Sequence, residues 1–161
     1  MNDVLQVLQE FHRDELARLL RHQAGARLMR QYDVNNTYQY IINREETHLS
    51  WLATAIGELG GPVDEGAAGP PAGAAGSEAD AGAAIERDAR DAVAFVEKWR
   101  PRVSALPNAR HAKMLNVILG EVLEQHRFFE QARAGRTDLL GRRGGWLEPA
   151  QGEVIAERWI E

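Results

Sequence analysis

Apolar residues recur at intervals of three and four along most of this chain, which is the spacing of one face of an α-helix. No segment shows the strict alternation of apolar and polar residues that is typical of a strand. The apolar stripes predict four helices, over residues 3–31, 36–59, 85–105 and 109–134. We expect Asn36 to cap the second helix and Gly60, Gly61 and Pro62 to end it. The predicted fold class is all-α.

The connection between the second and third helices, residues 62–84, is long and rich in Gly, Ala and Pro. It has no large apolar side chain after Val63, so it cannot form a core of its own. A helix of two dozen residues is about 36 Å long, and a connection of this length can cross that distance. The third helix would then run parallel to the second, which predicts a four-helix bundle over residues 1–135 with one long crossover. The alternative is a mobile linker between two independent helical hairpins, each of which would leave its apolar stripe exposed.

Residues 136–161 are predicted to form a separate C-terminal tail. The tail includes the amphipathic sequence GEVIAERWIE, which predicts a short helix. A helix this short is not stable alone. We therefore expect it to dock on the bundle or on a second subunit.

Composition narrows the classes of function. A chain of 161 residues with 44% hydrophobic and 27% charged side chains is typical of one globular domain, and no apolar run approaches the length of a membrane span. A formal net charge of −5 argues against a nucleic-acid surface. The absence of cysteine excludes disulfides, thiolate metal sites and cysteine nucleophiles. The start of the chain lacks the pattern of a signal peptide, so a cytoplasmic location is expected.

Polar residues interrupt the apolar stripe of the second helix. Glu45 and His48 are three residues apart, so they share a helix face and can reach one ion. Burying a carboxylate without a partner is costly, and a metal ion is one of the few partners that offset the cost. A carboxylate oxygen together with an imidazole nitrogen suits iron, manganese or zinc. The pair is therefore a candidate metal site.

The other three helices carry polar residues of the same kind on their stripes. These residues are His12, Glu15, His22, Asp88 and His126. Each also has a simpler interpretation. A single core histidine is more often satisfied by a backbone carbonyl or a carboxylate than by a metal, and Glu15 can pair with Arg18 or Arg21.

Two stretches of the chain resemble the ferritin-like superfamily, particularly its rubrerythrin and bacterioferritin branch. The sequence REETHLSWLATAIGELGGPV looks like that family's second helix, in which Glu-x-x-His is followed by apolar residues and Leu-Gly-Gly. The glycine-rich crossover and the sequence LNVILGEVLEQHRFFEQA extend the resemblance over residues 1–135. It implies a four-helix bundle that holds two metal ions.

The resemblance also implies a ligand set. In the family a carboxylate on the first helix, Glu-x-x-His on the second, a carboxylate on the third and Glu-x-x-His on the fourth hold the ions. The matching residues here are Glu15, Glu45, His48, Asp88 (or its neighbour Asp91) and His126.

Two features of this chain depart from the family pattern. Leu123 stands where the fourth-helix glutamate belongs, and Glu121 and Glu124 are turned away from His126 on a helix. Counted from the turn between the first two helices, His22 lies nearer the height of Glu45 than Glu15 does.

Two hypotheses of function follow. The first is a ferritin-like protein that binds iron or manganese, as two ions or one, and acts as an oxidoreductase on oxygen, peroxide or another small oxidant. The second is a degenerate bundle without metal chemistry that serves as a dimeric or partner-binding helical module. Leu123 favours the second, whereas His48 and His126 favour the first. A homodimer is expected under both, because helical bundles bury flat helical faces well.

Overall fold

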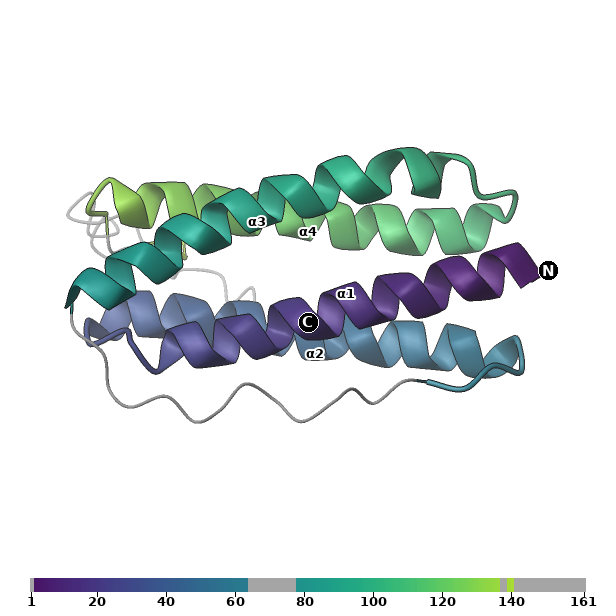
Figure 1. Cartoon of the computed structure of the whole chain (residues 1–161), viewed down its shortest axis with the longest axis horizontal. Coiled ribbons are helices and arrows are strands. Elements are labelled where there is room, and N and C mark those ends of the chain that lie inside the picture. Colours follow the sequence, from purple (N-terminus) through teal and green to yellow (C-terminus); the bar gives the residue numbers. More distant parts are fainter. Residues whose placement is uncertain (1, 64–77, 137–138, 141–161) are drawn as a thin grey trace, which may run out of the picture.

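The computed structural model describes residues 2–63, 78–136 and 139–140, which form four helices and no strand (Figure 1). The helices are α1 (Asn2–Ala26), α2 (Tyr32–Glu58), α3 (Glu78–Ser104) and α4 (Ala109–Arg133). The described part of the chain is all-α, as the apolar spacing predicts. None of its helices combines the length and the apolar character that crossing a bilayer would require.

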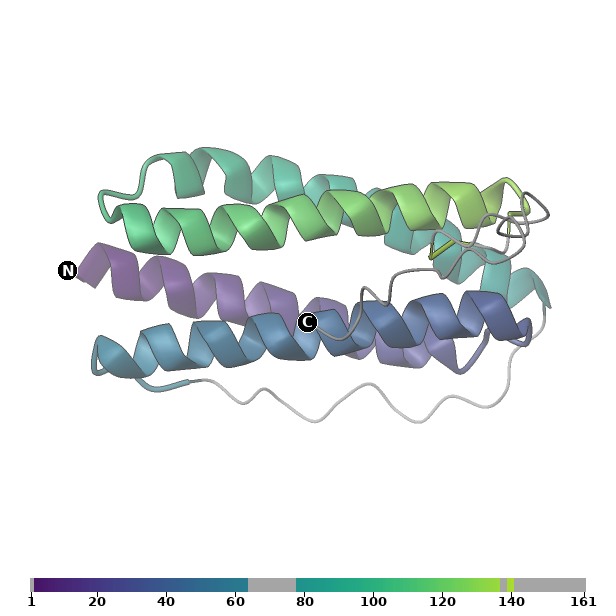
Figure 2. The same cartoon turned by 180° about the vertical axis from the view of Figure 1, so that it is seen from behind.

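The four helices lie side by side as two antiparallel hairpins. α1 packs mainly against α2, and α3 packs mainly against α4 (Figure 1, Figure 2). α2 ends at the opposite end of the molecule from the start of α3, so these two helices run parallel (Figure 1). Most of the predicted crossover, and the predicted helix in the tail, lie outside the described residues.

The ends of the helices differ in part from those predicted. α1 is shorter than expected, and α3 begins earlier, at Glu78. Asn36 does not cap α2; the side chain of Gln31 caps it instead, accepting a hydrogen bond of 2.8 Å from the Val34 amide. At the other end of α2, Gly60 has a φ of 77°, which a glycine adopts without strain.

Buried apolar side chains form two clusters, one toward each end of the helices. The first includes Leu8, Phe11, Leu52, Trp99 and Leu115. The second includes Leu19, Tyr38, Ile41, Phe128 and Phe129. On α1, Glu15 and Arg18 come after Phe11 of the first cluster and before Leu19 of the second. On the other helices polar residues also fall between members of the two clusters: Glu45 and His48 on α2, Asp91 on α3 and Gln125 on α4. A polar layer therefore crosses the middle of the molecule.

Candidate functional site

Six buried polar side chains from three helices make up most of this layer. We call them the central polar cluster: Glu15, Arg18 and His22 of α1, Glu45 and His48 of α2, and Gln125 of α4. None is more than 3% exposed. Their three- and four-residue spacing along α1 and α2 turns them toward the interior. An unpaired charge buried in this layer would cost roughly several kcal/mol of folding free energy. The partners of each residue therefore determine what the cluster can do.

Arg18 is the permanent cation of the cluster. Its guanidinium donates a hydrogen bond to Glu15 Oε2 at 3.3 Å on the same helix and one to Gln125 Oε1 at 2.8 Å, which links α1 to α4. It also lies 4.8 Å from the ring centroid of Phe95, in a cation–π arrangement. Burial opposes the charge on Arg18, but Glu15 and Glu45 outweigh burial and raise its pKa. Arg18 therefore remains charged, and the interpretation that Glu15 pairs with it is confirmed.

His48 joins the buried carboxylate of Glu15 to a carboxylate at the edge of the layer. Its Nδ1 lies 3.0 Å from Glu15 Oε1, and its Nε2 lies 2.5 Å from Glu121 Oε2. Arg44 donates to both oxygens of Glu121, at 2.6 and 3.1 Å. Burial disfavours a charged imidazole, but the two carboxylates outweigh it and raise the pKa of His48. A protonated His48 donates to Glu15 and to Glu121 at once.

The two carboxylates that accept from His48 are held in their charged forms. Burial would raise the pKa of Glu15, but the hydrogen bond from His48 and the charge on Arg18 together lower it. Burial acts the same way on Glu121, where the hydrogen bonds from Arg44 and His48 lower the pKa. Both side chains are therefore anions whose charge is compensated locally.

Glu45 and His22 form the less completely paired part of the cluster. Glu45 Oε1 lies 2.5 Å from His22 Nδ1, so His22 stands at the height of Glu45, as predicted. Burial raises the pKa of Glu45, and His22 offsets part of that effect. The second oxygen of Glu45 and the Nε2 of His22 are buried and have no hydrogen-bond partner among the described residues. These are the two atoms of the Glu45–His22 pair that could still bind a ligand.

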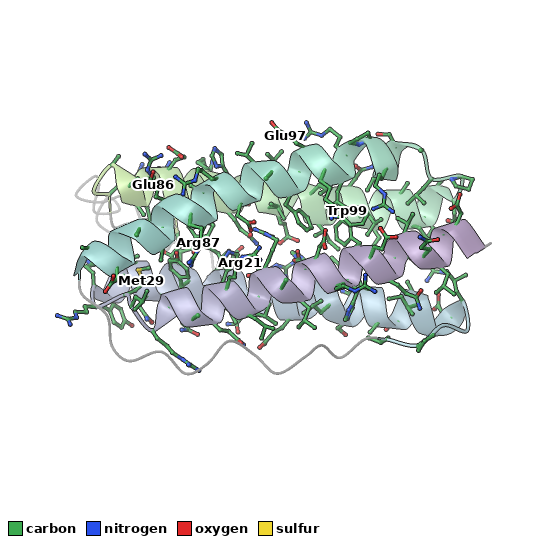
Figure 3. The ribbon with its side chains drawn as sticks, viewed as in Figure 1. Arg21, Met29, Glu86, Arg87, Glu97 and Trp99 are labelled. Atoms are coloured by element: carbon green, nitrogen blue, oxygen red, sulfur yellow. The ribbon has the colours of Figure 1, made fainter. Side chains whose placement is uncertain are left out.

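A third arginine, Arg21, approaches the layer from the space between α1 and α3 (Figure 3). Arg21 donates to Asp91 Oδ2 at 2.6 Å, and Arg18 Nε lies 3.5 Å from the same oxygen. Asp91 is 29% exposed, so this ion pair forms the outer edge of the layer on that side. α3 thus contributes a carboxylate next to Arg18, and that carboxylate is Asp91.

The structure brings together three of the five expected ligands. Glu15 and His48 contact each other, and Glu45 lies near enough to Glu15 for the charge of Glu15 to affect its pKa. Asp88 is buried elsewhere and accepts a hydrogen bond of 2.6 Å from the Tyr38 hydroxyl. His126 is partly exposed, and its Nδ1 lies 3.1 Å from the Ala89 carbonyl. A backbone carbonyl is the partner expected for a single core histidine that binds no metal.

The spacing of α4 explains why Glu121 and Gln125 were not among the predicted residues. Val122 and Phe129 are both buried, and either Gln125 or His126 continues the stripe between them at intervals of three and four. The metal hypothesis favoured the histidine, but the buried residue is Gln125. Glu121 was set aside because it is turned away from His126, yet its partner is His48, on another helix.

The donor set can be compared with what a metal ion needs. Among the described residues, no group of three or more His, Asp or Glu side chains is arranged to hold an ion. Both nitrogens of His48 and both oxygens of Glu15 already have partners, one of which is the Arg18 guanidinium. Two metal ions beside this buried cation would be strongly repelled. The described residues therefore do not fit a dinuclear centre. The ligand-type atoms of the cluster without a hydrogen-bond partner among these residues are Glu45 Oε2 and His22 Nε2.

Comparison with protein-family models, with curated proteins and with solved structures finds no match for this chain.

Proposed function

We propose that this chain is a ferritin-like four-helix bundle that binds one iron or manganese ion at the Glu45–His22 side of the central polar cluster. The observation that supports it is the pair of buried ligand atoms, Glu45 Oε2 and His22 Nε2, that have no hydrogen-bond partner among the described residues. Such atoms cost free energy unless a partner is bound. A carboxylate oxygen and an imidazole nitrogen suit both metals.

Each residue has a defined part in this proposal. Glu45 would hold the ion through its free oxygen, and His22 would supply a nitrogen once its ring turns from its present Nδ1 contact with Glu45. Glu15, whose charge acts on Glu45, would supply negative charge beside the ion. His48 orients Glu15 through its 3.0 Å contact. Arg18 limits the site to one ion, because its fixed charge takes the place that a second ion would need. A bound iron or manganese ion would supply one-electron redox chemistry, which is the basis for proposing an oxidoreductase.

The test is metal stoichiometry. Protein purified without chelator is incubated anaerobically with ferrous iron or with manganese, desalted and measured by elemental analysis. We expect one ion per chain in the wild type and none in a Glu45→Gln/His22→Gln variant with unchanged helical content. A matched control, Glu86→Gln/His126→Gln, changes the same residue types outside the cluster and should retain the ion. Two ions in the wild type would contradict the role given to Arg18, and no ion would refute the metal site.

The second candidate is a bundle without metal chemistry that serves as a dimeric or partner-binding module. One observation favours it: Arg18, Arg44 and a protonated His48 already compensate the charges of Glu15 and Glu121. A core compensated in this way needs no metal to remain folded. Absence of bound metal, together with a concentration-dependent mass in light scattering, would support this candidate over the first.

A further inference from the structure

Two hollows lie on one face of the molecule between α2 and α4, which Figure 2 shows side by side. We call the strip of surface that joins these hollows the α2–α4 groove. At one end it is a hollow of about 430 Å³ whose walls include Tyr40, Phe128 and Leu140. At the other end it is a hollow of about 330 Å³ whose walls include Trp51, Arg110, His111 and Met114. The Arg44–Glu121 contact bridges the two helices between these hollows.

The groove exposes large apolar side chains to solvent. Tyr40 is 40% exposed and Trp51 is 36% exposed on α2, and Val117 is 47% exposed on α4. Val117 lies on the same stripe of α4 as Met114 and Glu121, at helical spacing. Aromatic and β-branched side chains exposed along one groove are typical of a surface that another segment covers.

The chain itself enters this groove at its wider end. Leu139 is 5% exposed and packs in the second apolar cluster, and Leu140 forms part of the hollow beside Tyr40 and Phe128. The described part of the chain therefore ends at the groove. Because the tail follows directly from Leu140, it is nearer to the groove than any separate molecule and is the occupant we consider.

The sequence of the tail suits an apolar groove. In EVIAERWIE, residues 153–161, helical spacing puts Ile155, Ala156 and Trp159 on one face. Glu153 and Glu157 fall outside that face. Along α4 the groove from its Phe128 end to its Arg110 end is about 27 Å long. Residues 141–152 can span about 40 Å when extended, so the amphipathic segment can reach every part of the groove.

We propose that residues 153–161 bind in the α2–α4 groove of their own chain, with Ile155 and Trp159 packed against Trp51 and Val117. Glu153 and Glu157 then lie toward the far hollow, whose walls include Arg110 and Glu58. The proposal concerns the surface of the molecule and is independent of metal binding in the central polar cluster.

The absence of cysteine from the chain allows a single thiol to report on the groove. In a full-length Val117→Cys variant, the rate of modification by a maleimide reagent measures how well the tail covers position 117. Adding Ile155→Asp and Trp159→Asp places charges on the apolar face of the segment and should accelerate modification by about tenfold or more. The matched control is Ala94→Cys on an exposed part of α3, where the same tail changes should leave the rate unaltered.

The possible outcomes distinguish the tail of the same chain from a second copy of the chain as the occupant of the groove. Slow modification of the thiol at position 117 that does not depend on protein concentration and is lost with the two tail substitutions supports docking within the chain. Equal rates with and without the two tail substitutions would overturn the proposal. Protection that disappears on dilution of the protein would also overturn it, because the occupant would then be a second copy.

Discussion

Replacing Arg18 by methionine tests whether the central polar cluster is held together by its buried cation. Methionine keeps an unbranched apolar side chain in place of the arginine stem but has no charge and no donor. The side chain of Arg18 is 1% exposed, and it donates to Glu15 Oε2 and to Gln125 Oε1. The substitution therefore leaves two buried acceptors without a donor in a place that water does not reach.

The expected loss of stability follows from the two acceptor atoms that lose their donor, Glu15 Oε2 and Gln125 Oε1. A buried acceptor that loses its partner costs about 1–3 kcal/mol, more when the acceptor is charged. Glu15 is the charged acceptor and retains only its contact with His48. Removing one partner of a buried ion pair costs about 3–5 kcal/mol in other proteins, in agreement with this sum. We expect Arg18→Met to lower the free energy of unfolding by about 3–5 kcal/mol.

Urea unfolding of metal-free protein, followed by far-UV circular dichroism, measures this change. The matched control is Arg90→Met on α3, whose arginine is 69% exposed and pairs with Glu86; it should cost less than about 1 kcal/mol. Adding Glu15→Gln to Arg18→Met should recover part of the loss, because the unpaired charge is removed. A loss of less than about 1 kcal/mol for Arg18→Met alone would refute the view that Arg18 stabilises the cluster.

Three further predictions concern the metal-free protein. The pKa of Glu15 lies below its ordinary 4.5, so the stability that Glu15 contributes is lost as pH falls below about 4.5. The pKa of His48 lies above its ordinary 6.5, so the stability that His48 contributes is lost as pH rises above about 6.5. His48→Gln should abolish the loss on the alkaline side in urea titrations across pH. Gly57→Ala should stabilise the protein by about 0.5–1 kcal/mol, because nothing lies within 4 Å of an added Cβ. Gly60→Ala should destabilise it by about 1–2 kcal/mol, because Gly60 has a φ of 77°. Thermal unfolding distinguishes the two signs. Tyr38→Phe removes the donor to a buried carboxylate and should cost about 1–3 kcal/mol, measured in the same way.

Local patterns were enough to predict the four helices of the described residues and most of the residues that face inward. The three- and four-residue spacing placed Glu15, His22, Glu45 and His48 on buried faces, where the structure has them. Helix ends were less predictable. Gln31 caps α2 in place of Asn36 because a glutamine side chain at that position can reach the Val34 amide, which side-chain type alone does not indicate.

Partners across helices depended on tertiary structure. Glu45 and His48 are neighbours on one helix, yet each pairs with a residue of another helix: Glu45 with His22, and His48 with Glu15 and Glu121. These pairings depend on how far one helix slides and rotates against the next, and helical periodicity says nothing about either. The same reason explains why Asp88 meets Tyr38 instead of joining the cluster.

Helical periodicity within single segments was enough to predict that the described chain is all-α and that carboxylates and histidines interrupt its apolar stripes. That Arg18 lies among those residues and compensates their charge depends on how the helices pack, and no single segment indicates it. An arginine can extend its long side chain to solvent from most positions on a helix, so its burial is settled by the helices that pack around it.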